Sequence, residues 1–127
     1  MSTNLATHVR VDAKRPDRAR ALACHRLPTL LSNFEFEVGP LPSVEQDDAS
    51  LARSLTSCQR ALSRIATEDG VRLRSQQASL LAAACNALTL HQHLMVIESP
   101  LAEQVLDGVE RSLDKAAQFQ ARVSFGL

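Results

Sequence analysis

The chain has neither tryptophan nor tyrosine, and only four phenylalanines among its 127 residues. Its four glycines, Gly39, Gly70, Gly108 and Gly126, stand far apart, so no glycine-rich loop is present to cradle a phosphate. No apolar run approaches the length of a membrane-spanning helix, and the N-terminal residues lack the apolar core of a signal peptide. These absences argue against nucleotide chemistry, base stacking on aromatic rings and standard secretion.

The three cysteines, Cys24, Cys58 and Cys85, form neither a disulfide framework nor a paired metal motif. An odd number of cysteines without a C-x-x-C spacing is typical of buried free thiols in a reducing compartment. No serine lies in a G-x-S-x-G sequence, which would mark a nucleophile on a sharp turn. We therefore expect no catalytic residues, no cofactor and no enzymatic activity.

Histidines supply the remaining candidate metal ligands, together with Cys24 beside His25. His91 and His93 form an H-x-H sequence inside a predicted helix, where side chains two residues apart lie about 200° apart around the axis. The two rings cannot hold one ion in that arrangement. We expect His91 to face the core or an interface, and we predict no metal site.

Alanine and leucine dominate the apolar residues, whereas valine and isoleucine number only nine and two. Ala and Leu lose little side-chain freedom in a helix, so this composition indicates an all-α fold. Apolar residues recur at steps of three and four over three long segments, as they do on one side of a helix. We expect the resulting core to include Leu55, Leu62, Leu81, Leu88, Val109 and Leu113.

Short turn signals separate the three periodic segments. Ser43 is followed three residues later by Gln46, as in a capping box, and Gly70 and Pro100 mark the later boundaries. Because these later turns are short, consecutive helices must run antiparallel. We predict an up-down helical bundle of three long antiparallel helices plus a shorter N-terminal helix, with the long helices over residues 43–68, 72–98 and 100–123.

The N-terminal part is less regular. We expect residues 1–14 to be a mobile arm and residues 15–127 to form a single domain. Apolar spacing predicts a short helix over 16–26, and Pro28 should stop or kink it before a second turn over 28–33.

A ridge of small residues, Gly108, Ser112 and Ala116, follows one side of the last predicted helix. A glycine inside a helix costs about 1 kcal/mol relative to alanine. We expect close approach to the alanine-rich preceding helix to offset that cost.

Between the first two helices, residues 34–38 read FEFEV and alternate between apolar and acidic side chains. This is the pattern of a strand, but no second strand is predicted to pair with it. We expect an extended linker over 34–42 whose Phe34, Phe36 and Val38 dock on the bundle. The alternative is strand pairing between molecules, in a homodimer or with a partner protein.

Charge is balanced overall, with 14 basic and 14 acidic residues, yet it is segregated along the chain. Neutrality argues against a dedicated nucleic-acid binder. Arg53, Arg60 and Arg64 share one face of a predicted helix and form the best candidate for contact with an anionic partner. Two alternatives are a solvated face and pairing with the acidic residues of the last helix, Glu103, Asp107, Glu110 and Asp114.

Together these features predict a small bacterial protein–protein interaction module without enzymatic activity. An adaptor, a chaperone-like protein and a regulator are the candidate roles, in specialised secretion or in host–phage conflict. Its partner would be another protein, not a small-molecule substrate, and we expect the cytoplasm as its compartment, with export independent of a signal peptide as the alternative. The predicted partner-binding residues are Phe34, Phe36, Val38, Arg53, Arg60 and Arg64. The second hypothesis is a binder of anionic surfaces, either membrane or nucleic acid, through the same arginines.

Overall fold

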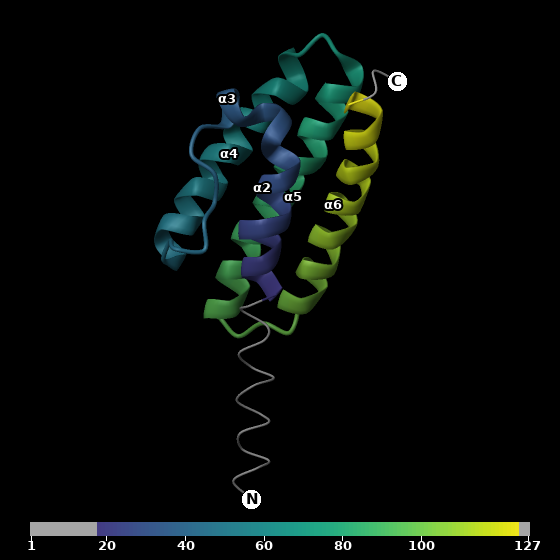
Figure 1. Ribbon diagram of the computed structural model, residues 1–127. Coiled ribbons are helices and arrows are strands. Elements are labelled where there is room, and N and C mark those ends of the chain that lie inside the picture. The colour runs from purple at the N-terminus through teal and green to yellow at the C-terminus, as the bar shows by residue number, and fades with distance from the viewer. Residues whose placement is uncertain (1–17, 125–127) are drawn as a thin grey trace, which may run out of the picture.

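The computed structural model describes residues 18–124, except for the side chains of 121–124. This part of the chain is helical with no strand, so the predicted all-α fold is confirmed. Residues 18–38, which we term the first helical segment, form a nearly continuous helix, and a connection over 39–47 leads to three long helices. The elements after helical residues 18–21 are η1 (Leu22–Arg26), α2 (Leu27–Leu30), η2 (Leu31–Phe34), α3 (Glu35–Val38), α4 (Asp48–Glu68), α5 (Arg72–Val96) and α6 (Ala102–Ser124) (Figure 1).

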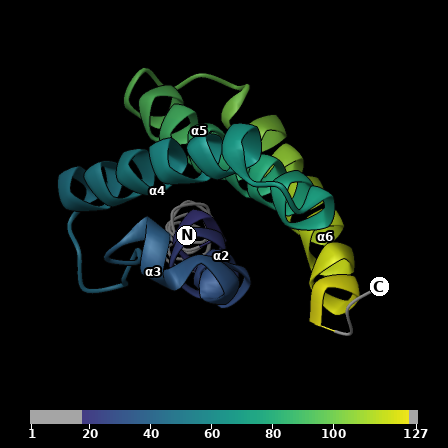
Figure 2. The ribbon, with the colours of Figure 1, turned by 90° about the horizontal axis from the view of Figure 1, so that it is seen from above.

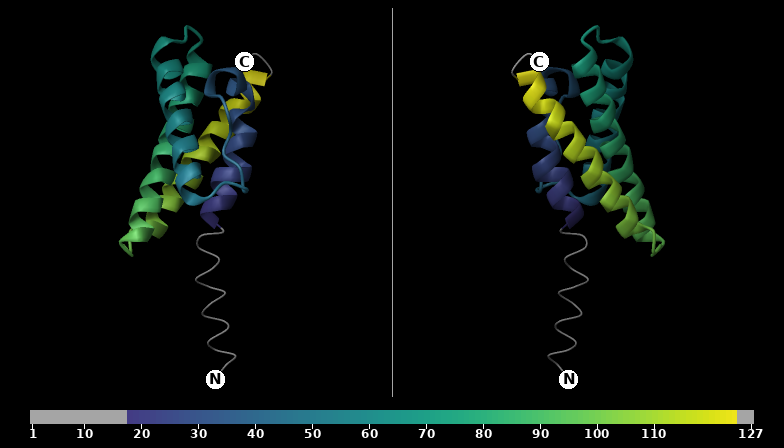
Figure 3. Two further views of the ribbon diagram at one scale, coloured as in Figure 1. Left: turned by 90° about the vertical axis from the view of Figure 1, so that its left-hand side faces the viewer. Right: turned by 90° about the vertical axis from the view of Figure 1, so that its right-hand side faces the viewer.

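The long helices form a curved layer in the order α4, α5, α6, and the first helical segment lies against the concave side of this layer (Figure 2). Along the layer each helix turns back on the one before, as the short turns predicted (Figure 3). The segment contacts all three long helices, so its apolar side closes the core that the layer alone would leave open to water.

Polar contacts give the direction of the first helical segment. Arg18 lies beside Glu103, Arg26 beside Asp114, and Asn33 beside Gln120, so residue numbers rise together and the segment runs parallel to α6. The first helical segment also runs parallel to α4. The chain must therefore return along the length of the bundle between the end of this segment and the start of α4. The nine residues 39–47 can reach about 30 Å when extended, and the 21 residues of α4 are about 31 Å long.

The core follows the predicted apolar periodicity. All six residues expected to be buried are almost inaccessible to solvent, which confirms the helical phase of α4, α5 and α6. Leu27, Leu31 and Phe34 of the first helical segment are fully buried beside them. One apolar cluster therefore joins the segment to the layer.

Of the two outcomes expected at Pro28, a stop and a kink, the stop is wrong, because the helix continues through this residue. Directly before Pro28 the chain makes one π-helical turn, in which the Leu27 N–H donates to the carbonyl of Leu22. Proline lacks an N–H and its ring crowds the carbonyl four residues earlier, so a wider turn before it relieves that conflict. Burial of the apolar side favours continuing the helix.

The expected extended linker over 34–42 is also wrong in its first half, since residues 35–38 form α3. In a strand Phe34, Phe36 and Val38 would share one side, whereas in a helix Phe34 and Val38, four residues apart, share a side and Phe36 lies about 200° away from each. Accordingly, Phe34 and Val38 are buried and Phe36 is 94% exposed. The structure therefore contains no strand here that could pair with another molecule.

The predicted start of the second helix is five residues too early. Ser43 and Gln46 do bond to each other, with the Ser43 N–H donating to Gln46 Oε1 at 3.0 Å, but they form an isolated turn. Asp47 is the residue that caps α4, its carboxylate accepting the N–H of Ser50 at 2.7 Å. The other long helices begin and end within two residues of the predicted positions.

Gly108 does not make the predicted close approach to α5. A Cβ built on it would meet only the Arg111 Nη2, at 3.8 Å, which is ordinary contact. Gly108 therefore has no packing role that would offset its unfavourable helix propensity.

We predict that Gly108→Ala raises the free energy of unfolding by about 0.5–1 kcal/mol, because alanine loses less backbone entropy in a helix. Gly39→Ala is the contrasting variant. Gly39 has φ +74° at the end of α3, so alanine there should cost about 1–3 kcal/mol despite the open space around it. Chemical denaturation measures both. If Gly108→Ala were less stable than the wild type, the open space observed around Gly108 would be contradicted, and close packing of Gly108 against α5 would be indicated instead.

Candidate functional site

The candidate site is a groove along the exposed side of α4. Arg53, Arg60 and Arg64 lie along one face of this helix, and all three side chains line the groove. The cavity has a volume of about 760 Å³ and is open to solvent. We call it the basic groove.

Hydroxyl and imidazole groups complete the basic groove. Thr56 and Ser57 come from α4, while Thr89 and His93 come from the facing side of α5. The end of α3 closes it near Glu37. All these side chains except Glu37 can donate hydrogen bonds, so the groove presents mainly donors to a ligand.

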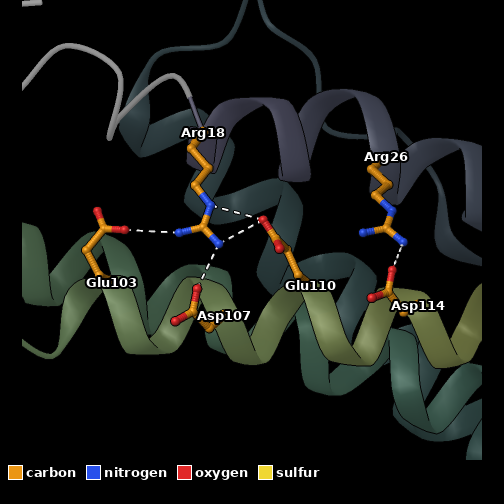
Figure 4. A network of polar contacts seen from close by, with 6 residues as sticks. All are labelled: Arg18, Arg26, Glu103, Asp107, Glu110 and Asp114. Carbon is orange, nitrogen blue, oxygen red and sulfur yellow. Dashed lines mark hydrogen bonds and ion pairs between the residues drawn. The ribbon is translucent and has the colours of Figure 1, made fainter. Parts of the chain in front are cut away.

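Arg18 and Arg26 of the first helical segment are paired with acidic residues of α6, whereas Arg20 pairs with Asp48 at the start of α4. Arg18 binds three carboxylates spaced along one side of that helix: Glu103 at 3.0 Å, Asp107 at 2.8 Å and Glu110 at 2.8 Å (Figure 4). The hydrogen bonds to Asp107 and Glu110 raise the pKa of the Arg18 guanidinium, because these carboxylates favour its charged form. About two helical turns further along the segment, Arg26 pairs with Asp114, which lies about one turn beyond Glu110 on α6.

The alternative in which α6 neutralises the arginines of α4 is therefore wrong. In the described part of the chain Arg60 and Arg64 make no ion pair, and Arg53 only donates to Ser50 Oγ, at 3.0 Å. The three remain exposed to solvent. Hydrogen bonds from Ser50, and to a smaller extent the charge of Arg53, lower the pKa of the Asp47 carboxyl, but no ion pair among the described residues neutralises any of the three arginines.

The six predicted partner-binding residues divide into two groups. Phe34 and Val38 belong to the core, and Phe34 cannot contact a partner. Val38 is 2% exposed and lines the inner wall of the basic groove at its α3 end. Arg74 lies over the Phe34 ring, 4.7 Å from its centroid, and also bonds Glu37 at 2.7 Å, which fastens α3 to the start of α5. Phe36 is exposed, on the same helical turn as Glu37 at the edge of the basic groove.

Sequence reasoning missed the donors that come from α5, and also one buried amide. Thr89 and His93 reach the groove only because α5 packs beside α4, which no local pattern reveals. Gln77 is fully buried, and its Nε2 donates to the Ala116 carbonyl at 3.2 Å and to Gln120 Oε1 at 2.7 Å. Gln77 lies about two helical turns before Ala84 and about three before Leu88, so it falls on the buried side of α5. This spacing could have predicted its burial from the sequence.

The cysteines are free and buried, as the sequence predicted. Burial raises the pKa of the Cys58 thiol to about 11, and it also raises the pKa values of Cys24 and Cys85. These thiols are therefore protonated near neutral pH and poor nucleophiles. Within residues 18–124 no group of three or more His, Cys, Asp or Glu side chains is placed to hold a metal ion.

His91 is almost completely buried, at 3% exposure, and its Nε2 has no hydrogen-bond partner in the described part of the structure. Burial lowers the pKa of this imidazole, with Arg18 adding to the effect and Glu103 opposing it. His91 is therefore neutral near pH 7. His93, two residues after His91, is exposed instead. The two histidines therefore lie on different sides of α5, as predicted.

Comparison with known proteins adds no relative, since no family model, no curated protein and no solved structure matches the chain. None of the helices in the described range is long and apolar enough to cross a bilayer. The site must therefore be interpreted from its own chemistry.

We predict that His91 makes stability depend on pH. In the unfolded chain the imidazole takes up a proton as the pH falls through about 6.5, whereas buried His91 resists protonation. The free energy of unfolding should therefore fall below that pH, down to the lower pKa of the folded state.

The variant His91→Leu isolates this effect, because all other titrating groups remain. Urea denaturation of both proteins between about pH 8 and pH 5 should show the wild type losing stability relative to the variant on acidification. Parallel curves across the whole range would contradict the assigned burial.

Proposed function

We propose that this protein is a small interaction module that binds an acidic segment of a partner protein in the basic groove. The observation that supports this most is a contrast in charge. Arg18, Arg20, Arg26 and Arg74 are held in ion pairs, whereas the three arginines of the basic groove form no ion pair among the described residues. Unpaired charges gathered in one groove favour a ligand of opposite charge.

The spacing of the arginines suits an extended acidic peptide. At 1.5 Å per residue, Arg53 and Arg60 are about 10 Å apart along the axis of α4, and Arg60 and Arg64 about 6 Å. An extended chain advances about 3.3 Å per residue, so carboxylates about three and about two residues apart would match them. Arginine binds a carboxylate with two parallel hydrogen bonds, which adds geometric selection to the charge.

An exposed aromatic ring on α3, the helix whose end closes the groove, offers an apolar anchor outside the groove itself. Phe36 lies at the α3 end, on the same helical turn as Glu37 of the groove. Aromatic and arginine side chains are enriched among the residues that carry binding energy at protein interfaces. A partner with an apolar residue next to its acidic segment would use both features.

This chemistry fits an adaptor, a chaperone-like protein or a regulator that acts by binding. Phosphates of a nucleic acid or of an anionic membrane would also be attracted to the three arginines. We favour a protein partner because the described residues provide no platform of aromatic rings for bases.

The test compares two double charge reversals of equal net charge. Arg60→Glu with Arg64→Glu changes the basic groove, whereas Arg72→Glu with Arg111→Glu changes two other exposed arginines that line neither side of it. Fluorescence anisotropy would follow a dye-labelled serine peptide carrying glutamates at two- and three-residue intervals. We expect the groove variant to bind it at least about tenfold more weakly, which is about 1.4 kcal/mol, and the control variant to resemble the wild type.

The same titrations with single-stranded oligothymidylate and with phosphatidylserine vesicles distinguish the partner classes. Stronger binding of either probe than of the peptide would favour the anionic-surface hypothesis. Equal losses in both variants would show only a general effect of net charge and would contradict a specific groove. A pull-down from source cells, compared between the two variants, then identifies proteins retained through the groove alone.

A further inference from the structure

A second cavity lies on the other side of α4 and α5, between the first helical segment and the junction where α4 begins and α5 ends. Its volume is about 290 Å³. Apolar side chains form most of its walls, namely Ala19, Ala23, Leu51, Leu55, Leu88 and Met95. An apolar cavity on the order of 150 Å³ holds one benzene, so this one has room for about two fused rings.

The polar residues at the mouth of this cavity are already paired with one another. Arg20 binds the Asp48 carboxylate at 2.9 Å, and the Gln92 Nε2 donates to the Asp48 carbonyl at 3.1 Å. The mouth therefore offers no unpaired charge to a ligand. A charged ligand would lose its hydration inside the apolar walls without an opposite charge to replace it, so the cavity favours a neutral one.

One lining group is left unsatisfied. His91 is among the residues around this cavity, it is 3% exposed, and its Nε2 lacks a hydrogen-bond partner in the described structure. Leaving a buried nitrogen unbonded is costly, and leucine at this position would avoid that cost. Nε2 has almost no accessible surface of its own, so a ligand with one hydrogen-bonding group would satisfy it only once a neighbouring side chain moves. Met95, one turn further along α5, is unbranched and flexible enough to move aside and admit such a group.

We propose that this cavity binds a neutral aromatic or alicyclic molecule of one or two rings that carries a single hydroxyl group, with the rings against the leucines and the hydroxyl bonded to His91 Nε2. The neutral imidazole can donate to or accept from that hydroxyl through this nitrogen. The site is separate from the basic groove and does not depend on the function proposed for it. It adds a small-molecule ligand, which the sequence did not predict.

The experiment uses 2-naphthol and naphthalene, which differ only by the hydroxyl group. The chain contains only two methionines, Met1 and Met95, so the labelled methyl signal of Met95 in an NMR spectrum reports on this cavity directly. We expect saturable shifts of the Met95 signal with both compounds, and at least about fivefold tighter binding of 2-naphthol. The basic-groove variant Arg60→Glu with Arg64→Glu should bind both compounds as the wild type does.

Two variants test the walls and the hydrogen bond separately. His91→Leu should keep the affinity for naphthalene, lose the preference for 2-naphthol and raise the melting temperature of the free protein. Ala19→Leu should fill the cavity and abolish binding of both compounds. Ala21→Leu is its matched control, because Ala21 lies on the exposed side of the same helix.

Absence of a saturable Met95 shift in the wild type would overturn the proposal. A preference for 2-naphthol that persists in His91→Leu would overturn it as well. A Met95 signal that responds to protein concentration, and not to the probes, would place a second copy of the chain in the cavity. A signal that changes only when residues 1–17 are deleted would place that segment there, and either result would contradict a small-molecule site.

Discussion

The rest of the structure depends on the pairing between the first helical segment and the acidic side of α6. Arg18 brings one guanidinium to three carboxylates that would otherwise repel one another, and Arg26 repeats the contact further along. Isolated surface ion pairs contribute little, but a shared arginine forms a network that needs fewer side chains to be ordered for each contact. These contacts select one register and direction for the segment, while its buried leucines and Phe34 supply most of the stabilisation.

Two consequences follow from this pairing. The segment runs parallel to α6 and α4, so the chain needs the long connection over 39–47 to return to the start of α4. The acidic residues of α6 are used within the fold, which leaves the arginines of α4 exposed and without carboxylate partners in the described structure. The balanced net charge of the chain therefore conceals a basic surface, and the proposed function depends on that surface.

Periodicity predicted the long helices because their apolar residues are local in sequence and follow one repeat. It also predicted that His91 faces the core or an interface, and it left open whether the α4 arginines are solvated, paired with α6 or bound to a partner. Periodicity failed at residues 34–38, FEFEV. This sequence is compatible with a strand, through its two-residue alternation, and with a helix, through the four-residue spacing of Phe34 and Val38. Only packing against α4 and α5 decides between the two structures. Two other features depend on contacts between segments far apart in the sequence, which no local pattern contains. One is the pairing of Arg18 with α6, and the other is the position of Thr89 beside the arginines of α4.

The central claim is that the acids of α6 pair with the first helical segment and not with α4. Two double-mutant cycles, measured by urea denaturation at low salt, compare these pairings: Arg18→Gln with Glu110→Gln, and Arg60→Gln with Glu110→Gln. The account predicts a coupling energy of about 1 kcal/mol between Arg18 and Glu110 that shrinks in about 1 M salt, with Arg60 and Glu110 additive to within about 0.3 kcal/mol. Additivity in the first cycle together with coupling in the second would contradict it.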